Sequence, residues 1–99
     1  MNISLKTFTS LTINKNTARE NYGDWQTSYE FAKSVCLYLK NCGIKPDIIV
    51  EPTCGIGNFI AAAIDVFHTV KKVYGVEISE EYISQTEQRL QKYKNSNRI

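Results

Sequence analysis

The stretch that decides the fold is IIVEPTCGIGNF, which spans Ile48–Phe59. It begins with a short apolar run, as expected for a strand of a parallel sheet covered on both faces. Gly55 and Gly57 then supply a tight turn, and an apolar pattern with helical spacing follows. A second apolar run, Lys72–Ile78, contains a carboxylate near its end, Glu77. The sequence therefore predicts a strand, a glycine turn, a helix and a second strand with an acidic tip.

This layout is typical of a site for a nucleoside cofactor. The glycines let the backbone approach the ligand, and an acid at the tip of the second strand can accept hydrogen bonds from both ribose hydroxyls. Ile60 stands where dinucleotide-binding motifs carry a third glycine. Glu51, directly before the turn, would repel a pyrophosphate but suits a sulfonium or ammonium group. Both departures favour S-adenosyl-L-methionine, and an NAD-binding domain is the less favoured alternative.

The same residues resemble a known family. The stretch Ile49–Phe59 resembles the first cofactor motif of class I S-adenosylmethionine-dependent methyltransferases, in the form found in adenine-specific DNA methyltransferases and the methylase subunits of restriction systems. Gly75–Ile78 resembles their second motif. Gly23–Ser28 is similar to the Gly-x-Phe-x-Thr-Pro loop before their first helix, with serine in place of the proline. The resemblance covers residues 22–93 and implies an α/β, partial Rossmann-like fold of order α-β-α-β-α with a short parallel sheet.

The resemblance also implies a set of cofactor-binding residues. Glu51 would orient the turn or hold the methionine ammonium group, and Glu77 would bind the ribose from an open strand tip, so that its removal leaves the fold intact. By analogy, Ile78 would lie on the adenine ring and Thr27 near the methionine carboxylate. Each has a structural alternative: a solvated strand end for Glu51, a helix cap for Glu77 and Thr27, and a core position for Ile78. The full expected set is Thr27, Glu51, Pro52, Thr53, Gly55, Gly57, Glu77 and Ile78.

The catalytic loop of the family is missing from this sequence. That loop has the form Asp/Asn-Pro-Pro-aromatic and holds the target amino group of a flipped base. The prolines here are Pro46 and Pro52, which are not adjacent. We therefore expect no catalytic residue and interpret the chain as the cofactor-binding part of a DNA adenine methyltransferase, a fragment or truncated product that is inactive alone. A noncatalytic binding module that keeps the fold is the alternative.

Composition limits the number of domains, the class of partner and the cellular location that can be expected. Ninety-nine residues suit one domain, and a net charge of +2 is too small to indicate nucleic acid, so DNA as a partner rests on the resemblance alone. The three cysteines, Cys36, Cys42 and Cys54, have no metal-binding spacing and favour a reducing, cytoplasmic location. Cys54 lies in the turn, but His68 is at the far end of the next helix, so a buried filler is expected rather than a nucleophile. No membrane span or signal peptide is predicted.

The remaining patterns set the helices and the domain limits. Thr27 and Glu30 form a capping box at the start of a helix whose apolar residues are Phe31, Val35, Tyr38, Leu39 and Cys42. Ser79 is expected to cap the last helix. We divide the chain into a poorly defined N-terminal segment with hints of extended structure (1–22), a cofactor-binding domain (23–93) and a tail (94–99). Two strands leave one sheet edge open, which predicts a homo-oligomer or an N-terminal segment folded over the edge of Asp47–Glu51.

Overall fold

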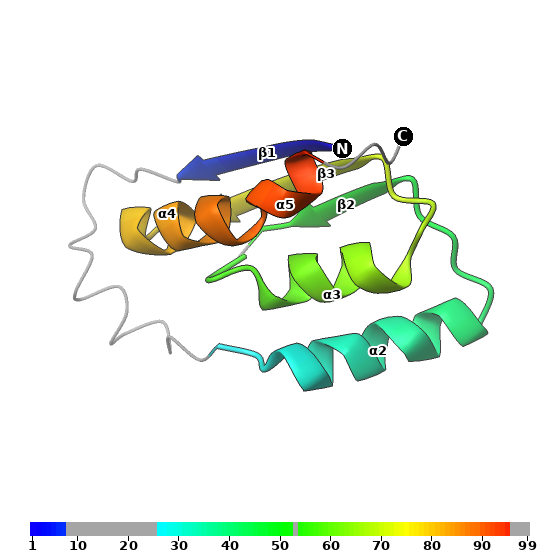
Figure 1. Ribbon diagram of the computed structural model, residues 1–99. Coiled ribbons are helices and arrows are strands. Elements are labelled where there is room, and N and C mark those ends of the chain that lie inside the picture. Colours follow the sequence, from blue (N-terminus) through cyan, green and yellow to red (C-terminus); the bar gives the residue numbers. More distant parts are fainter. Residues whose placement is uncertain (8–25, 53, 96–99) are drawn as a thin grey trace.

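The computed structural model describes residues 1–7, 26–52 and 54–95. Strands and helices alternate along the chain, as the sequence predicts for an α/β fold (Figure 1). In chain order the elements are β1 (Asn2–Thr7), α2 (Tyr29–Asn41), β2 (Ile48–Glu51), α3 (Asn58–Val66), β3 (Lys72–Glu77), α4 (Glu80–Arg89) and α5 (Gln91–Lys94).

The sheet has three parallel strands in the order β1-β3-β2. In register, Val73 of the central strand lies between Ile3 and Ile49. The predicted parallel α/β fold is confirmed, with one strand more than the sequence pattern counted, because Asn2–Thr7 pairs with β3. All strands end at the same edge of the sheet, where α3 and α4 begin (Figure 1). This arrangement brings the glycine turn and the acidic strand tip together.

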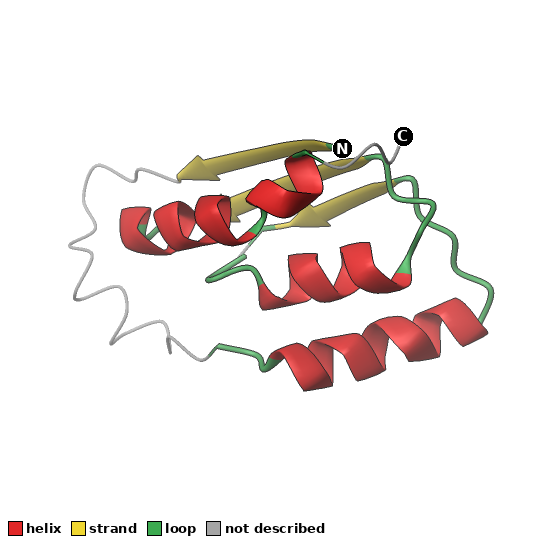
Figure 2. Ribbon diagram, viewed as in Figure 1, coloured by secondary structure: helices red, strands yellow, loops and turns green. Residues whose placement is uncertain are grey.

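The helices cover one face of the sheet. α3 packs against β2, α4 packs against β1 and β3, and α2 lies on the outer side of α3 (Figure 2). The core between these layers includes the fully buried side chains of Ile60, Ile64 and Leu90. The alanine run of α3 is buried as well, and its small side chains allow the helix to pack closely against its neighbours. The apolar face predicted for α3 is therefore confirmed.

The opposite face of the sheet has no helix on it in the described part of the chain. Ile48 and Val50 of β2 are 53% and 64% exposed, and Tyr74, paired with Val50, is 37% exposed. Parallel strands are normally covered on both faces. The expectation that both faces of this strand are covered is thus wrong for the described residues.

Helix α2 departs from the sequence prediction in two ways. Its N-cap is Ser28, whose Oγ accepts a hydrogen bond from the Phe31 amide at 3.2 Å, so the capping box predicted at Thr27 is wrong by one residue. Its buried residues are Ala32 and Cys36, whereas Phe31 and Tyr38 of the predicted apolar stripe are largely exposed. Small residues face α3 because they let two helices approach closely, and the larger side chains consequently point outward.

The two edges of the sheet differ. β1 pairs with β3, so the alternative in which the N-terminal segment covers the edge of Asp47–Glu51 is wrong for Asn2–Thr7. Within the described residues, β2 is an edge strand with β3 as its neighbour. None of the helices in the described segments is long and apolar enough to cross a membrane.

Candidate functional site

The site is built around the turn that joins β2 to α3. The Cys54 amide donates to the Val76 carbonyl at 2.9 Å, and the Gly57 amide donates to the Cys54 carbonyl at 2.8 Å. These bonds hold the turn against the carboxyl end of β3. Gly55 and Gly57 have φ values of 54° and 88°, in the left-handed region that other residues rarely adopt. The backbone conformation therefore explains why glycine occupies both positions.

Helix α4 packs against the turn through Thr86. A Cβ at Gly57 would lie 2.8 Å from Thr86 Cγ2, so glycine is needed there for close approach as well. The fully buried Thr86 donates from Oγ1 to the Gly55 carbonyl at 2.8 Å. In the sequence, Tyr82, Thr86, Leu90 and Tyr93 recur at helical spacing, which predicts that Thr86 faces inward but does not indicate this role. A hydroxyl within an apolar stripe is the signal that could have shown it, since a buried polar group requires a partner.

Glu77 ties the turn to the start of α4. Its Oε1 accepts from the Gly55 amide at 3.2 Å and its Oε2 accepts from the Ser79 amide at 2.7 Å. Ser79 in turn caps α4, because its Oγ accepts from the Tyr82 amide at 3.3 Å, which confirms the predicted cap. A carboxylate has about four acceptor positions, so these two bonds leave Glu77 with capacity for more. The residue is half-buried rather than at an open strand tip.

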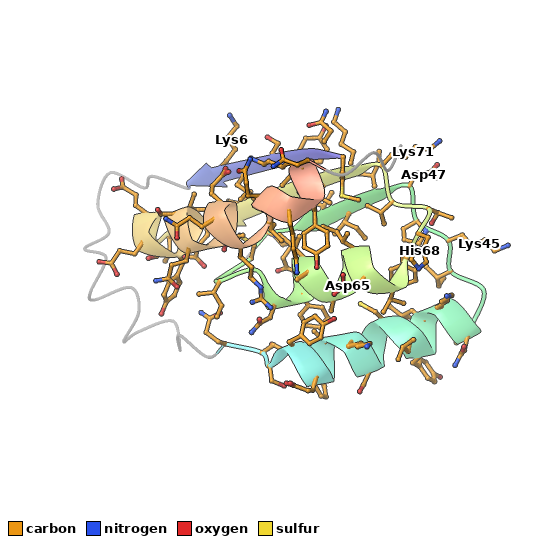
Figure 3. All side chains as sticks on the ribbon, viewed as in Figure 1. Lys6, Lys45, Asp47, Asp65, His68 and Lys71 are labelled. Carbon is orange, nitrogen blue, oxygen red and sulfur yellow. The ribbon has the colours of Figure 1, made fainter. Side chains whose placement is uncertain are left out.

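Negative charge surrounds the turn. Burial, followed by the nearby carboxylates of Glu77 and Glu51, raises the pKa of the Cys54 thiol to about 12. The thiol is buried and protonated at neutral pH, so the interpretation of Cys54 as a filler rather than a nucleophile is supported. His68 lies at the opposite end of α3 from the turn (Figure 3). The same carboxylates would attract a cationic ligand to this edge of the sheet.

A loop before α2 forms another side of the site. The Ile56 amide donates to Gln26 Oε1 at 3.3 Å, and Asn58 Nδ2 donates to the Thr27 carbonyl at 2.7 Å. Thr27 therefore lies beside the glycine turn through its main chain, although Ser28 is the helix cap. Neither Gln26 nor Asn58 was singled out from the sequence, and both contacts join segments far apart along the chain.

A polar cluster holds the helices around this loop. Tyr29 of α2 and Tyr93 of α5 donate their hydroxyls to the two oxygens of Asp65, at 2.5 Å and 2.7 Å. Asp65 projects from α3 (Figure 3). The hydrogen bond to Asp65, together with burial, raises the pKa of Tyr29, and burial together with the same carboxylate raises that of Tyr93. The cluster therefore joins three helices through one carboxylate.

The expected site residues gather at the carboxyl end of the sheet. Thr27 is joined to α3, Gly55 to Glu77, and Glu51 is paired with Gly75 in register. Pro52 is exposed beside the turn, and Ile78 is half-buried directly after β3. Thr53 and the Gly23–Trp25 part of the predicted loop lie outside the described residues.

The sequence of the chain is similar to part of a known methyltransferase. No protein-family model and no solved structure matches it. The Type II methyltransferase M.NspV of Nostoc sp. is 46% identical over 76 residues, which are 77% of this chain and 16% of the relative. The chain thus spans less than a fifth of that relative's length. The resemblance predicted from the motifs is confirmed: the chain is a methyltransferase-like α/β polypeptide, with a fold consistent with a partial Rossmann-like methyltransferase, and its sequence corresponds to one part of a Type II methyltransferase.

Proposed function

We propose that the chain binds S-adenosyl-L-methionine as the cofactor-binding part of a DNA methyltransferase, with adenine as the expected target base. The observation that supports it best is the glycine turn tied to Glu77 at the carboxyl end of parallel strands. Ligands of open α/β sheets bind at this end, and the glycines allow close approach of the backbone. When bound, the cofactor supplies the activated methyl group.

The positions of the two carboxylates and the two glycines support a role for each of them. Glu77 has acceptor capacity left for the ribose hydroxyls, and Glu51 provides negative charge for the ammonium or sulfonium group. Gly55 and Gly57 shape the turn. The remaining candidates, by analogy with the family, are Thr27 for the methionine end, Ile78 for the adenine ring, and Pro52 and Thr53 as further residues of the first cofactor motif.

Ile60 argues against a dinucleotide. It is fully buried, and its Cδ1 lies 3.1 Å from the position of a Cβ on Gly75. The side chain therefore fills the space between α3 and the sheet, where a dinucleotide-binding motif has its third glycine for close packing of helix on strand. NAD binding is for this reason the weaker candidate.

The DNA substrate and a role in restriction-modification are proposed from the resemblance and from the relative, which is a Type II methyltransferase. A cytoplasmic location is proposed from the cysteines, which have no disulfide or metal-binding pattern. A noncatalytic binding module with the same fold is the second candidate, because the Asp/Asn-Pro-Pro-aromatic loop is missing from the sequence. Both candidates share the cofactor site and differ in whether methyl transfer follows.

Calorimetry with S-adenosylmethionine should show binding with a Kd of roughly 10 µM to 1 mM, as expected for an incompletely enclosed pocket. A Gly55→Asp variant is the control, because a Cβ at Gly55 would clash with Gln26 Oε1, and the new side chain would disrupt a turn whose Gly55 amide donates to Glu77. NAD should bind more weakly than S-adenosylmethionine. A folded sample that binds nothing at about 5 mM ligand, a free energy of about −3 kcal/mol, would contradict the proposal.

Methyl transfer by this chain to adenine-rich DNA should not exceed the background of the Gly55→Asp variant. The physical reason is that no adjacent prolines are present to build the loop that positions the target amine. Labelled cofactor and a filter-binding count would measure it. Incorporation above that background would show that other residues position the base and would exclude the noncatalytic candidate.

The chain should also self-associate through the edge of β2 and the uncovered sheet face. An exposed apolar edge of a parallel sheet favours pairing with another strand, and Ile48 and Val50 extend that surface. Light scattering across a concentration series should therefore show a rising mass, and a Val50→Lys variant should reduce it. A monomeric mass up to about 100 µM would limit any dimer to less than roughly 5 kcal/mol of association free energy and would refute the idea.

A further inference from the structure

We propose that Asn58 is a positioning residue that anchors the loop Gln26–Ser28 to the glycine turn, and that Arg89 holds Asn58 in place. The inference rests on the proposed function in one respect, that loop and turn together form the cofactor pocket. Asn58 is not among the cofactor-binding residues expected from the motifs.

Asn58 has a donor and an acceptor facing two different partners. Its Nδ2 donates to the Thr27 carbonyl at 2.7 Å, and its Oδ1 accepts from the Arg89 guanidinium. Thr27 offers a carbonyl and Arg89 offers only donors, so a single orientation of the amide satisfies both. The side chain is thereby fixed in direction as well as in place.

Arg89 joins this contact to two further elements. It is the last residue of α4, and its guanidinium lies 6.0 Å from the centre of the Tyr29 ring at the start of α2. Asn58 is the first residue of α3. One arginine therefore connects the beginnings of α2 and α3 with the end of α4, while Thr86 of the same helix holds the turn itself.

Asn58 provides a strong link between the loop and the turn. A weaker link, from the Ile56 amide to Gln26 Oε1, is 3.3 Å long and exposed to water. The contact of Asn58 is shorter and half-buried, and short shielded hydrogen bonds resist competition from water better. Losing it should leave the loop free to move away from the turn.

Asn58→Asp is the variant that separates anchoring from folding. The carboxylate still accepts from Arg89 and lies in the first turn of α3, where negative charge is favourable, so the melting temperature should stay the same or rise. It has no hydrogen to donate to the Thr27 carbonyl. We expect the affinity for S-adenosylhomocysteine to fall about 3- to 10-fold, the scale of one lost hydrogen bond. This product lacks the sulfonium charge, so the attraction of that charge to the new carboxylate does not contribute to the measured affinity.

Tyr93→Phe is the matched control. It removes a hydrogen bond of similar length, from α5 to Asp65, on a part of α3 away from the turn. It should lower the melting temperature and leave the affinity unchanged. Equal losses of affinity in the two variants, or no loss in Asn58→Asp, would overturn the inference.

Amide hydrogen exchange decides the anchoring without any cofactor. In Asn58→Asp, exchange at the amides of Ile56 and Phe31 should be several-fold faster, because their acceptors are the Gln26 and Ser28 side chains of the loop. Exchange at Val73 in the central strand should not change. Equal rates in variant and wild type would refute the inference. A wild-type chain that does not bind the product would contradict the proposed function alone, and the exchange result would still decide the role of Asn58.

Discussion

Glu77→Ala should abolish measurable cofactor binding and also lower the free energy of unfolding by about 2–4 kcal/mol. Two hydrogen bonds to a charged acceptor contribute about 3–6 kcal/mol when shielded, and Glu77 is only half-buried. The sequence placed Glu77 at an open strand tip and therefore predicted that this change leaves the fold intact, but the side chain is half-buried and hydrogen-bonded to two amides. Glu77 holds the amides of Gly55 and Ser79, so its loss releases both the turn and the start of α4. Urea denaturation and calorimetry on the same sample would measure the two effects.

Two further variants serve as comparisons for Glu77→Ala. Glu30→Ala removes an exposed acid from the first turn of α2 and should change stability by less than about 1 kcal/mol. Glu77→Gln keeps one acceptor oxygen and should lose less stability than Glu77→Ala. If Glu77→Ala were as stable as wild type, the two hydrogen bonds would contribute nothing to folding.

Ile60→Ala should destabilise the fold by about 2–5 kcal/mol, the range for large-to-small changes in a packed core. The side chain is fully buried between α3 and the sheet and lies against Gly75. Because the stability of a small domain is about 5–15 kcal/mol, a large share of molecules should unfold near physiological temperature. The shift of the urea midpoint measures the loss.

Ile48→Ala is the matched control for the core prediction, because it removes the same atoms from a position that is 53% exposed. It should cost well under about 1 kcal/mol in a dilute sample. A cost similar to that of Ile60→Ala would mean that the uncovered face of the sheet is packed in solution, as it would be in an oligomer.

The strand, turn, helix and acidic strand tip could be predicted because each depends on neighbouring residues. Glycines at the turn, an apolar run before it and an alanine-rich helix after it all favour the same local structure. The position of β3 along the chain could also be predicted, since the apolar run Lys72–Ile78 extends only one residue beyond the strand Lys72–Glu77.

The helix cap, the buried side of α2 and the links from α4 to the turn could not be predicted, because they depend on contacts between distant segments. Thr27 and Ser28 are both good caps, and the sequence does not say which one the helix uses. The periodicity of α2 defines an apolar stripe, but the alanines of α3 select the side with Ala32 and Cys36 for packing. The links from Thr86 to Gly55 and from Arg89 to Asn58 join α4 to the turn region, and no local pattern encodes them.

In the described part of the chain the helices cover one face of the sheet (Figure 2), and this has a thermodynamic consequence. The heat-capacity change and the denaturant m-value of unfolding both scale with the apolar surface newly exposed. Ile48, Val50 and Tyr74 are already in contact with water in the folded chain. Both quantities should therefore be smaller than the average for 99 residues, about 1.2–1.5 kcal/mol/K for the heat capacity, and should rise when another polypeptide covers that face.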